Sequence, residues 1–156
     1  MSNPHLLAPW LRLTLTPGVG PSVQRQLLAA FGLPERIFDA GHSAIAGVIG
    51  ALAARTLLDH DSAAAVELAL EWGDQPGNTI LTLGDAAYPA LLLEIPDPPV
   101  TLYVKGDPLL LARQSIAVVG ARSATPQGEA NAEAFATSLS QAALCIVSGL
   151  ALGIDA

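Results

Sequence analysis

The residues of this sequence that could do chemistry gather in two glycine-containing loops near its carboxyl end. The first loop follows the apolar run Ser115–Val119 and carries Gly120, Arg122 and Ser123. A glycine at the end of a strand lets the chain turn sharply and lets a ligand approach the backbone. An arginine is suited to bidentate contact with a phosphate. We therefore expect this loop to bind a phosphate group.

A helix is predicted to begin directly after the first loop. Thr125 is a good N-cap residue, and Pro126 suits the first position of a helix. Loop N–H groups that precede a helix N-terminus form a ready anion site. The alternative is that Arg122 only pairs with a carboxylate or lies on the surface, and the sequence leaves that alternative open.

A second glycine loop follows the apolar run 144–147. It contains Ser148, Gly149 and Gly153 and reaches Asp155. A continuous apolar run is typical of a parallel strand that is buried on both faces, and ligands gather at the carboxyl ends of such strands. Asp155 is expected either to cap a following helix or to touch a ligand.

Several familiar chemistries are excluded by what these loops lack. The dinucleotide fingerprint G-x-G-x-x-G is absent, because Ala121 and Arg122 follow Gly120, and no acidic residue ends the second strand. No GxxxxGK[ST] segment occurs, which excludes a P-loop. NAD and P-loop ATP chemistry are therefore not expected, and no cofactor is predicted.

No catalytic or metal-binding set emerges either. The histidines lack metal-like spacing, the serines of the two loops have no evident base, and the single cysteine stands in an apolar strand, where a buried, inert thiol is expected. These residues are His5, His42, His60, Ser123, Ser148 and Cys145. We therefore predict no metal site and no enzyme.

The elements that must position the loops form two parts. Helices are expected over residues 5–14, 22–31, a short stretch from Pro34, 43–49 and 61–72, with Asp61 or Ser62 as a cap. Strands are expected at 79–83, 100–105, 115–119 and 144–147, with single helical turns within 85–99 and at 108–111. The helix after Thr125 should pack on the sheet through Ala132, Phe135, Ala136 and Leu139. The predicted fold class is α/β, with a helical domain at 1–73, a linker at 74–78 and the first, incomplete part of a Rossmann-like parallel sheet at 79–156.

The charge distribution predicts no basic surface of the kind that binds nucleic acid. The net charge is −7, and residues 51–114 hold three basic and nine acidic residues. Phosphate binding needs cations, so any contact with nucleic acid must come from particular residues. No apolar run approaches the length of a membrane span, and the start lacks the basic region of a secretory signal. We expect a cytoplasmic protein with no membrane contact.

Taken in order, these segments resemble the DNA-processing protein A (DprA/Smf) family. The segment Leu13–Gly20 with its following helix resembles the family's N-terminal SAM-like or helix-hairpin-helix domain, although the turn itself is a weak signal that favours a purely structural hairpin. The segment Tyr88–Gly106 resembles the lead-in to the family's sheet. The two loops, Val118–Gly128 and Ser148–Asp155, match the family's paired glycine loops.

The resemblance implies a function that is not catalytic. Family members bind single-stranded DNA, dimerise through the Rossmann-like domain and hand the DNA to the RecA recombinase during natural transformation of competent cells. By position, Arg122 would grip a DNA phosphate. The DNA-binding residues implied are Gly120, Arg122, Ser123, Thr125, Gly128, Ser148, Gly149 and Gly153. Family members continue well beyond residue 156, so the chain is expected to be truncated within that domain.

Two other functions remain open. One is a Rossmann-like nucleotide hydrolase that resembles the lysine-decarboxylase-like group, which would need a further glycine-rich loop with a catalytic Glu. The other is a non-catalytic interaction module whose N-terminal helices dock a partner protein.

Overall fold

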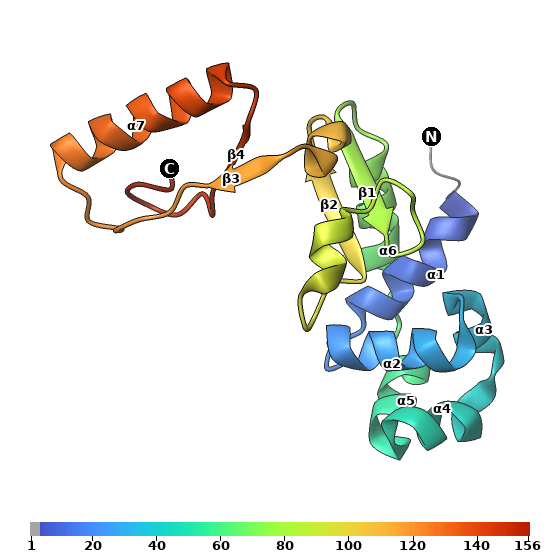
Figure 1. Ribbon diagram of the computed structural model, residues 1–156. Coiled ribbons are helices and arrows are strands. Elements are labelled where there is room, and N and C mark those ends of the chain that lie inside the picture. Colours follow the sequence, from blue (N-terminus) through green and yellow to red (C-terminus); the bar gives the residue numbers. More distant parts are fainter. Residues whose placement is uncertain (1–3) are drawn as a thin grey trace. The chain divides into compact units, whose positions relative to one another are not determined.

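The computed structural model describes residues 4–156, with side chains from His5 onward (Figure 1). The chain divides into two compact units, Met1–Pro108 and Leu109–Ala156. The predicted linker at 74–78 does not coincide with this division, which follows the compactness of the chain. That 74–78 separates two domains of the family stays a prediction. Within the described residues, no helix is both long enough and apolar enough to cross a bilayer.

The first unit begins with short helices. They are α1 (Pro4–Leu15), α2 (Pro21–Phe31), α3 (Pro34–Asp39), α4 (Gly41–Ile49), α5 (Ala51–Asp59) and α6 (Ala63–Gly73). Proline opens α2 and α3, and Gly32 ends α2 with a φ of 83°. The structure confirms every helix predicted in this region. The sequence prediction missed α5. Of the two predicted caps for α6, it is Asp61 whose side chain accepts a hydrogen bond from the Ala63 amide, at 3.0 Å.

Two hydrophobic clusters hold the first unit together, and α1 contributes to both. One joins Leu13 to α2, α3, α4 and α5 through Leu27, Ile37, Ile45 and Leu57, all fully buried. The other joins Leu7, Trp10 and Leu11 to Ala69, Ile80 and Val100. Burial of a Leu or Ile side chain contributes about 1.5–3 kcal/mol, so these clusters carry the stability of this unit.

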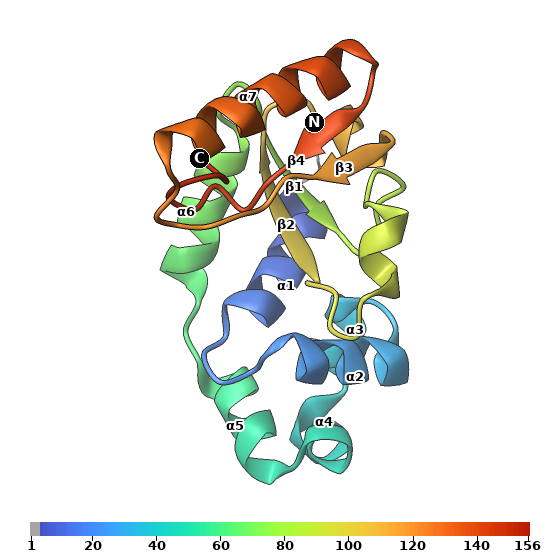
Figure 2. The ribbon, with the colours of Figure 1, turned by 60° about the vertical axis from the view of Figure 1, so that its left-hand side comes forward.

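A two-stranded antiparallel sheet packs beside α1 and α6 (Figure 2). Strand β1 (Asn78–Thr82) pairs with β2 (Thr101–Lys105), with Ile80 opposite Tyr103. Both strands were predicted. The connection between them contains the 3₁₀ helix η1 (Ala90–Glu94), as expected for the helical turn in that stretch. Trp72 of α6 contacts Tyr103 edge to face, with ring centroids 5.3 Å apart.

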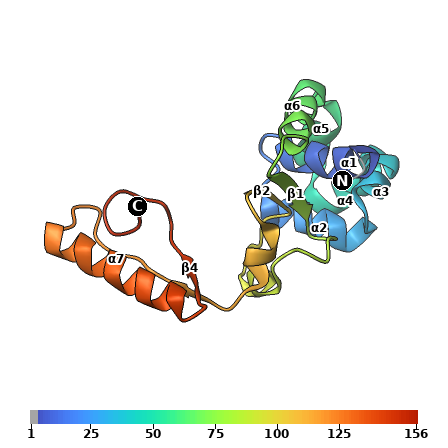
Figure 3. The same ribbon diagram turned by 90° about the horizontal axis from the view of Figure 1, so that it is seen from above.

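The second unit holds the predicted strand–helix–strand sequence (Figures 1 and 3). The 3₁₀ helix η2 (Pro108–Ala112) leads into β3 (Ser115–Ala117), followed by α7 (Pro126–Gln141) and β4 (Cys145–Val147). Strands β3 and β4 are parallel, with Ile116 opposite Ile146. The helical turn at η2 and the parallel pair confirm the sequence prediction.

Burial in the second unit is lower than predicted. All of β3 is exposed, and Val119 is 70% exposed, because only β4 pairs with β3 among residues 4–156. The prediction that 115–119 is buried on both faces is wrong for this chain. Cys145 is half-buried. On α7, Ala132, Ala136 and Leu139 are half-buried as predicted, whereas Phe135 is 68% exposed.

Candidate nucleic-acid interface

The two glycine loops of the second unit lie against each other at the carboxyl ends of β3 and β4. The Val118 amide donates to the Val147 carbonyl at 2.9 Å, which extends the parallel pairing to the start of the first loop. Beyond it, the Ile154 amide donates to the Ala121 carbonyl at 3.3 Å. The predicted loops therefore form one structure instead of two separate ligand contacts.

Asp155 connects the two loops in a way that the sequence did not reveal. Its Oδ1 accepts a hydrogen bond from the Gly120 amide at 2.9 Å, across 35 residues of sequence. Its carbonyl oxygen accepts from the Ser148 hydroxyl at 2.6 Å. Asp155 thus binds the first loop through its side chain and the start of the second through its backbone. The only sequence signal for this contact was a carboxylate in a loop that should meet another loop.

The glycines make this close contact possible. Gly153 has a φ of +88°, and a Cβ there would lie 2.2 Å from the Ala121 carbonyl oxygen. A Cβ on Gly120 would lie 2.7 Å from the side chain of Ile154, and one on Gly149 would lie 3.1 Å from Asp155 Oδ2. These glycines are explained by the packing of one loop on the other, before any ligand is considered.

The start of α7 is capped as predicted. The Thr125 hydroxyl accepts from the Gly128 amide at 3.1 Å, and Thr125 has the extended backbone of an N-cap residue. The amides of Gly120 and Gly128 are therefore already bonded within the chain. A phosphate at this site would have to use other donors.

Arg122 supplies such a donor. It is exposed, and within residues 4–156 its guanidinium forms no hydrogen bond or ion pair; the backbone amides of Arg122 and Ser123 likewise have no acceptor there. Within residues 4–156, Arg122 does not pair with a carboxylate, whereas its exposed position agrees with the alternative of a plain surface residue as well as with a role in binding. The arrangement presents a fixed loop with a free cation and free N–H groups, which suits an anion.

The cavity beside the loops has the opposite charge. It has a volume of about 640 Å³ and lies between α7 and the second loop, with Glu129, Glu133 and Asp155 in its lining. Three carboxylates disfavour a phosphate inside this cavity. An anion would therefore bind at the Arg122 surface of the loops.

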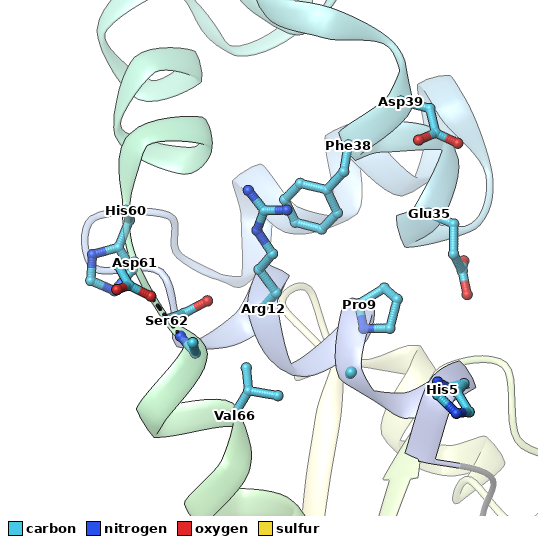
Figure 4. Close-up of a pocket in the computed structure, with 12 residues that line it drawn as sticks. His5, Pro9, Arg12, Glu35, Phe38, Asp39, His60, Asp61, Ser62 and Val66 are labelled. Atoms are coloured by element: carbon cyan, nitrogen blue, oxygen red, sulfur yellow. Dashed lines mark hydrogen bonds between the residues drawn. The ribbon is translucent and has the colours of Figure 1, made fainter.

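The three histidines all lie in the first unit. His5 and His60 line a pocket of about 590 Å³ formed by α1, α3 and the start of α6 (Figure 4). His42, on α4, is exposed. Among residues 4–156, no three His, Cys, Asp or Glu side chains are grouped as metal ligands would be. In this pocket, Arg12 lies over the Phe38 ring at 4.0 Å and so forms a cation–π contact.

The turn between α1 and α2, which resembles a helix-hairpin-helix turn, is accounted for by packing. Val19 is 3% exposed and belongs to the first hydrophobic cluster, and Gln24 donates to the Val19 carbonyl at 2.6 Å. Gly18 has a φ of +78°, which glycine adopts without strain. These contacts support the structural interpretation of this turn.

Comparisons with known proteins agree on one family. The sequence model of the DNA recombination-mediator protein A family matches residues 79–156. The protein Smf of Synechocystis sp. is 33% identical over 164 residues, which cover 94% of this chain and 38% of that protein. The DNA processing protein DprA of Streptococcus pneumoniae is 43% identical over 88 residues, which cover 56% of this chain and 30% of that protein.

Structural comparison gives the same result. The X-ray structure of DNA processing protein A from Streptococcus pneumoniae has a TM-score of 0.67 and 28% identity to this chain, and covers 99% of it. This chain spans 51% of that structure's chain. The predicted fold class, helices followed by an incomplete Rossmann-like sheet, is confirmed. The chain belongs to the DNA recombination-mediator protein A family, also called DprA/Smf.

Proposed function

We propose that this chain carries part of a single-stranded DNA-binding site and acts, within its whole protein, as a recombination mediator. One observation carries this proposal: the Arg122 guanidinium, which has no partner within residues 4–156, lies on a loop that is held by its contact with the second loop. Family membership and the names of the relatives support a role in DNA processing. No residue is assigned a catalytic role, and no cofactor is needed.

The finer parts of the proposal come from the family. They are the delivery of DNA to RecA during natural transformation, dimerisation of the whole protein, and a cytoplasmic location. Phosphate contacts position a nucleic acid without reading its sequence. We therefore expect binding that is insensitive to base sequence and sensitive to salt.

Fluorescence anisotropy with a labelled single-stranded oligonucleotide tests the role of Arg122 in the full protein. Arg122→Ala should weaken binding about 10- to 100-fold, because a hydrogen bond to a charged group contributes about 1.5–3 kcal/mol. It should also lower the slope of log affinity against log salt by about 0.7, the value for one phosphate contact on a single strand.

Matched variants make that result specific. Arg122→Lys keeps the charge without the bidentate geometry and should bind with intermediate affinity. Arg55→Ala removes an exposed arginine that pairs with Asp59 in α5 and should leave the affinity unchanged. Equal affinity of Arg122→Ala and the unaltered protein would contradict the assignment of Arg122.

The nucleotide hydrolase alternative has a direct assay. Release of free base from a nucleoside monophosphate by the full protein would favour it. The described residues offer no glutamate at the two loops except Glu129 and Glu133, which line the acidic cavity. If the protein acts as a recombination mediator, the full protein should release no base.

Docking of a partner protein by the helical unit is a second candidate function, favoured by the pocket of Figure 4. Glu35, Asp39 and Asp61 line this pocket, and Arg12 in it already contacts Phe38 and the Leu58 carbonyl. Within residues 4–156, Glu35 Oε2 is buried and has no hydrogen-bond partner. Such a pocket suits a lysine or arginine side chain of a partner.

Purified RecA is the probe for this second function. The double change Glu35→Gln with Asp39→Asn should weaken RecA binding if the pocket receives a basic side chain. Asp74→Asn, which neutralises an exposed carboxylate after α6, should not. Unchanged RecA binding in the double variant would argue against a role for this pocket in RecA docking.

A further inference from the structure

We infer that Asp155 is a positioning residue for Arg122: its carboxylate holds the first loop in the conformation that presents the guanidinium. This inference rests on the proposed binding of DNA phosphate by Arg122. It differs from the sequence-based expectations for Asp155, which were to cap a helix or to touch the ligand.

The contacts of Asp155 and its neighbours carry the inference. The Gly120 amide donates to Asp155 Oδ1 at 2.9 Å, two residues before Arg122. The Ile154 amide donates to the Ala121 carbonyl at 3.3 Å, one residue before Arg122. The Ser148 hydroxyl donates to the Asp155 carbonyl at 2.6 Å, which ties the end of the second loop back to its start. The chain on the N-terminal side of Arg122 is therefore bonded to a closed loop.

Charge and space exclude a direct role for Asp155 at the phosphate. A carboxylate repels a phosphate, and Asp155 also lines the acidic cavity together with Glu129 and Glu133. Its Oδ2 lies close to Gly149, where a Cβ would be 3.1 Å away, so the carboxylate faces both loops. Asp155 accepts the hydrogen bond of the Gly120 amide, which an external anion would otherwise accept.

Loss of this contact should act through Arg122. The hydrogen bond to the Asp155 carboxylate stabilises one conformation of the first loop, so its removal should let the loop move. The loop would then lose conformational entropy when it binds DNA, and this loss weakens the affinity. Asp155→Ala should weaken single-stranded DNA binding by about 10-fold or more and lower the salt slope as Arg122→Ala does. Asp155→Asn keeps an oxygen acceptor for the Gly120 amide and should stay within about threefold of the unaltered protein.

A double-mutant cycle in the full protein, by anisotropy with a labelled oligonucleotide, is the decisive experiment. If Asp155 acts by positioning Arg122, Asp155→Ala should cost nothing further in the Arg122→Ala background. A purely structural loss would cost the same in both backgrounds. Glu133→Ala, which removes another carboxylate of the acidic cavity, is the matched control and should not weaken binding.

The outcomes separate this inference from the proposed function. If Arg122→Ala weakens binding but Asp155→Ala binds as tightly as the unaltered protein, or more tightly, the positioning role is overturned while the DNA site stands. If the two changes are additive, positioning is also overturned. If Arg122→Ala itself binds normally, it is the proposed site that fails.

Discussion

At the scale of single residues, Gly153 explains why the two loops can touch. Its backbone has a φ of +88°, and any side chain would meet the carbonyl oxygens of Ala121 and Arg122. The position therefore combines a backbone conformation that disfavours side chains with a contact that has no room for one. The same loop carries Arg122, so a change at Gly153 should reach the proposed DNA site.

Gly153→Ala tests this coupling. The added Cβ would lie 2.2 Å from the Ala121 oxygen, so the loops must separate, and we expect single-stranded DNA binding in the full protein to fall at least 10-fold. Gly77→Ala is the matched control. Gly77 has a φ of +81° with nothing within 4 Å of an added Cβ. Gly77→Ala therefore adds only the cost of a left-handed conformation, about 1–2 kcal/mol, and this variant should bind DNA as tightly as the unaltered protein. Equal affinities of the two variants would show that the loop contact does not shape the site.

Tyr88 is a second residue with a measurable role, in the first unit. It is 6% exposed, and its hydroxyl donates to the Pro99 carbonyl at 2.7 Å. Burial raises the pKa of Tyr88 above its ordinary value of 10.0, and the nearby Arg25 lowers it by a smaller amount. Burial also raises the pKa of Tyr103. The folded unit therefore prefers the neutral phenols.

This preference predicts how stability depends on pH. A raised pKa in the folded state stabilises the fold fully below about pH 10, and that stabilisation is lost as the pH rises above it. Tyr88→Phe should be less stable by about 1 kcal/mol near pH 8, because a buried hydrogen bond is lost, and should show a shallower decline between pH 9 and 11. Urea unfolding followed by the fluorescence of Trp10 and Trp72 measures both effects. An unaltered decline in Tyr88→Phe would assign the alkaline loss to Tyr103 or to other groups.

At the scale of elements, α7 shows what a short sequence signal can predict. The pair Thr125–Pro126 fixed the start of this helix correctly, because an N-cap hydroxyl and a proline act locally and need no tertiary partner. The missed helix α5 shows the limit. Gly50, with a φ of +84°, joins α4 to α5 with no intervening loop, and α5 buries only Ala54 and Leu57 completely. This apolar face is no narrower than those of α4 and α6, which each bury one residue, so α5 was missed because no loop separates it from α4 and not because its periodicity is weak.

The candidate site was predictable in part for the same reason. Its loops and Arg122 follow from local patterns of glycine and strand ends. The contact between Gly120 and Asp155 joins residues 35 positions apart, and no local pattern encodes which of several donors a distant carboxylate will meet. The exposure of β3 was likewise beyond the sequence, because an apolar run does not say how many neighbouring strands cover it.

Removal of the Thr125 cap tests how much this hydrogen bond stabilises the start of α7. Thr125→Ala should destabilise the first turn of α7 by about 1 kcal/mol, whereas Thr125→Ser keeps the hydroxyl acceptor and should not. Amide hydrogen exchange at Gly128, the donor to this cap, should become roughly fivefold faster in Thr125→Ala. Slow exchange at Gly128 in Thr125→Ala would indicate that another group caps the helix.

At the scale of the whole chain, the hydrophobic core is distributed unequally between the two compact units. Every residue of both hydrophobic clusters lies in the first unit. By contrast, none of residues 109–156 is fully buried, and Val119, Phe135, Leu150 and Leu152 are more than two thirds exposed. The proposed DNA site thus stands on the unit with the smaller core, and its geometry depends on hydrogen bonds between loops.

This distribution predicts different folding behaviour for the two units. Residues 1–108 expressed alone should unfold cooperatively by heat, because both clusters are retained, and Leu27→Ala in that fragment should lower its stability by about 2–5 kcal/mol. Residues 109–156 alone should show no cooperative transition by circular dichroism, since two short strands and one helix bury too little apolar surface to offset the loss of chain entropy. Leu150→Ala, at a position that is 85% exposed, should leave the melting of the complete chain unchanged. A cooperative transition in the 109–156 fragment would mean that the hydrogen-bonded loops, rather than apolar burial, are enough to fold this unit. Asp155→Ala should then abolish that transition.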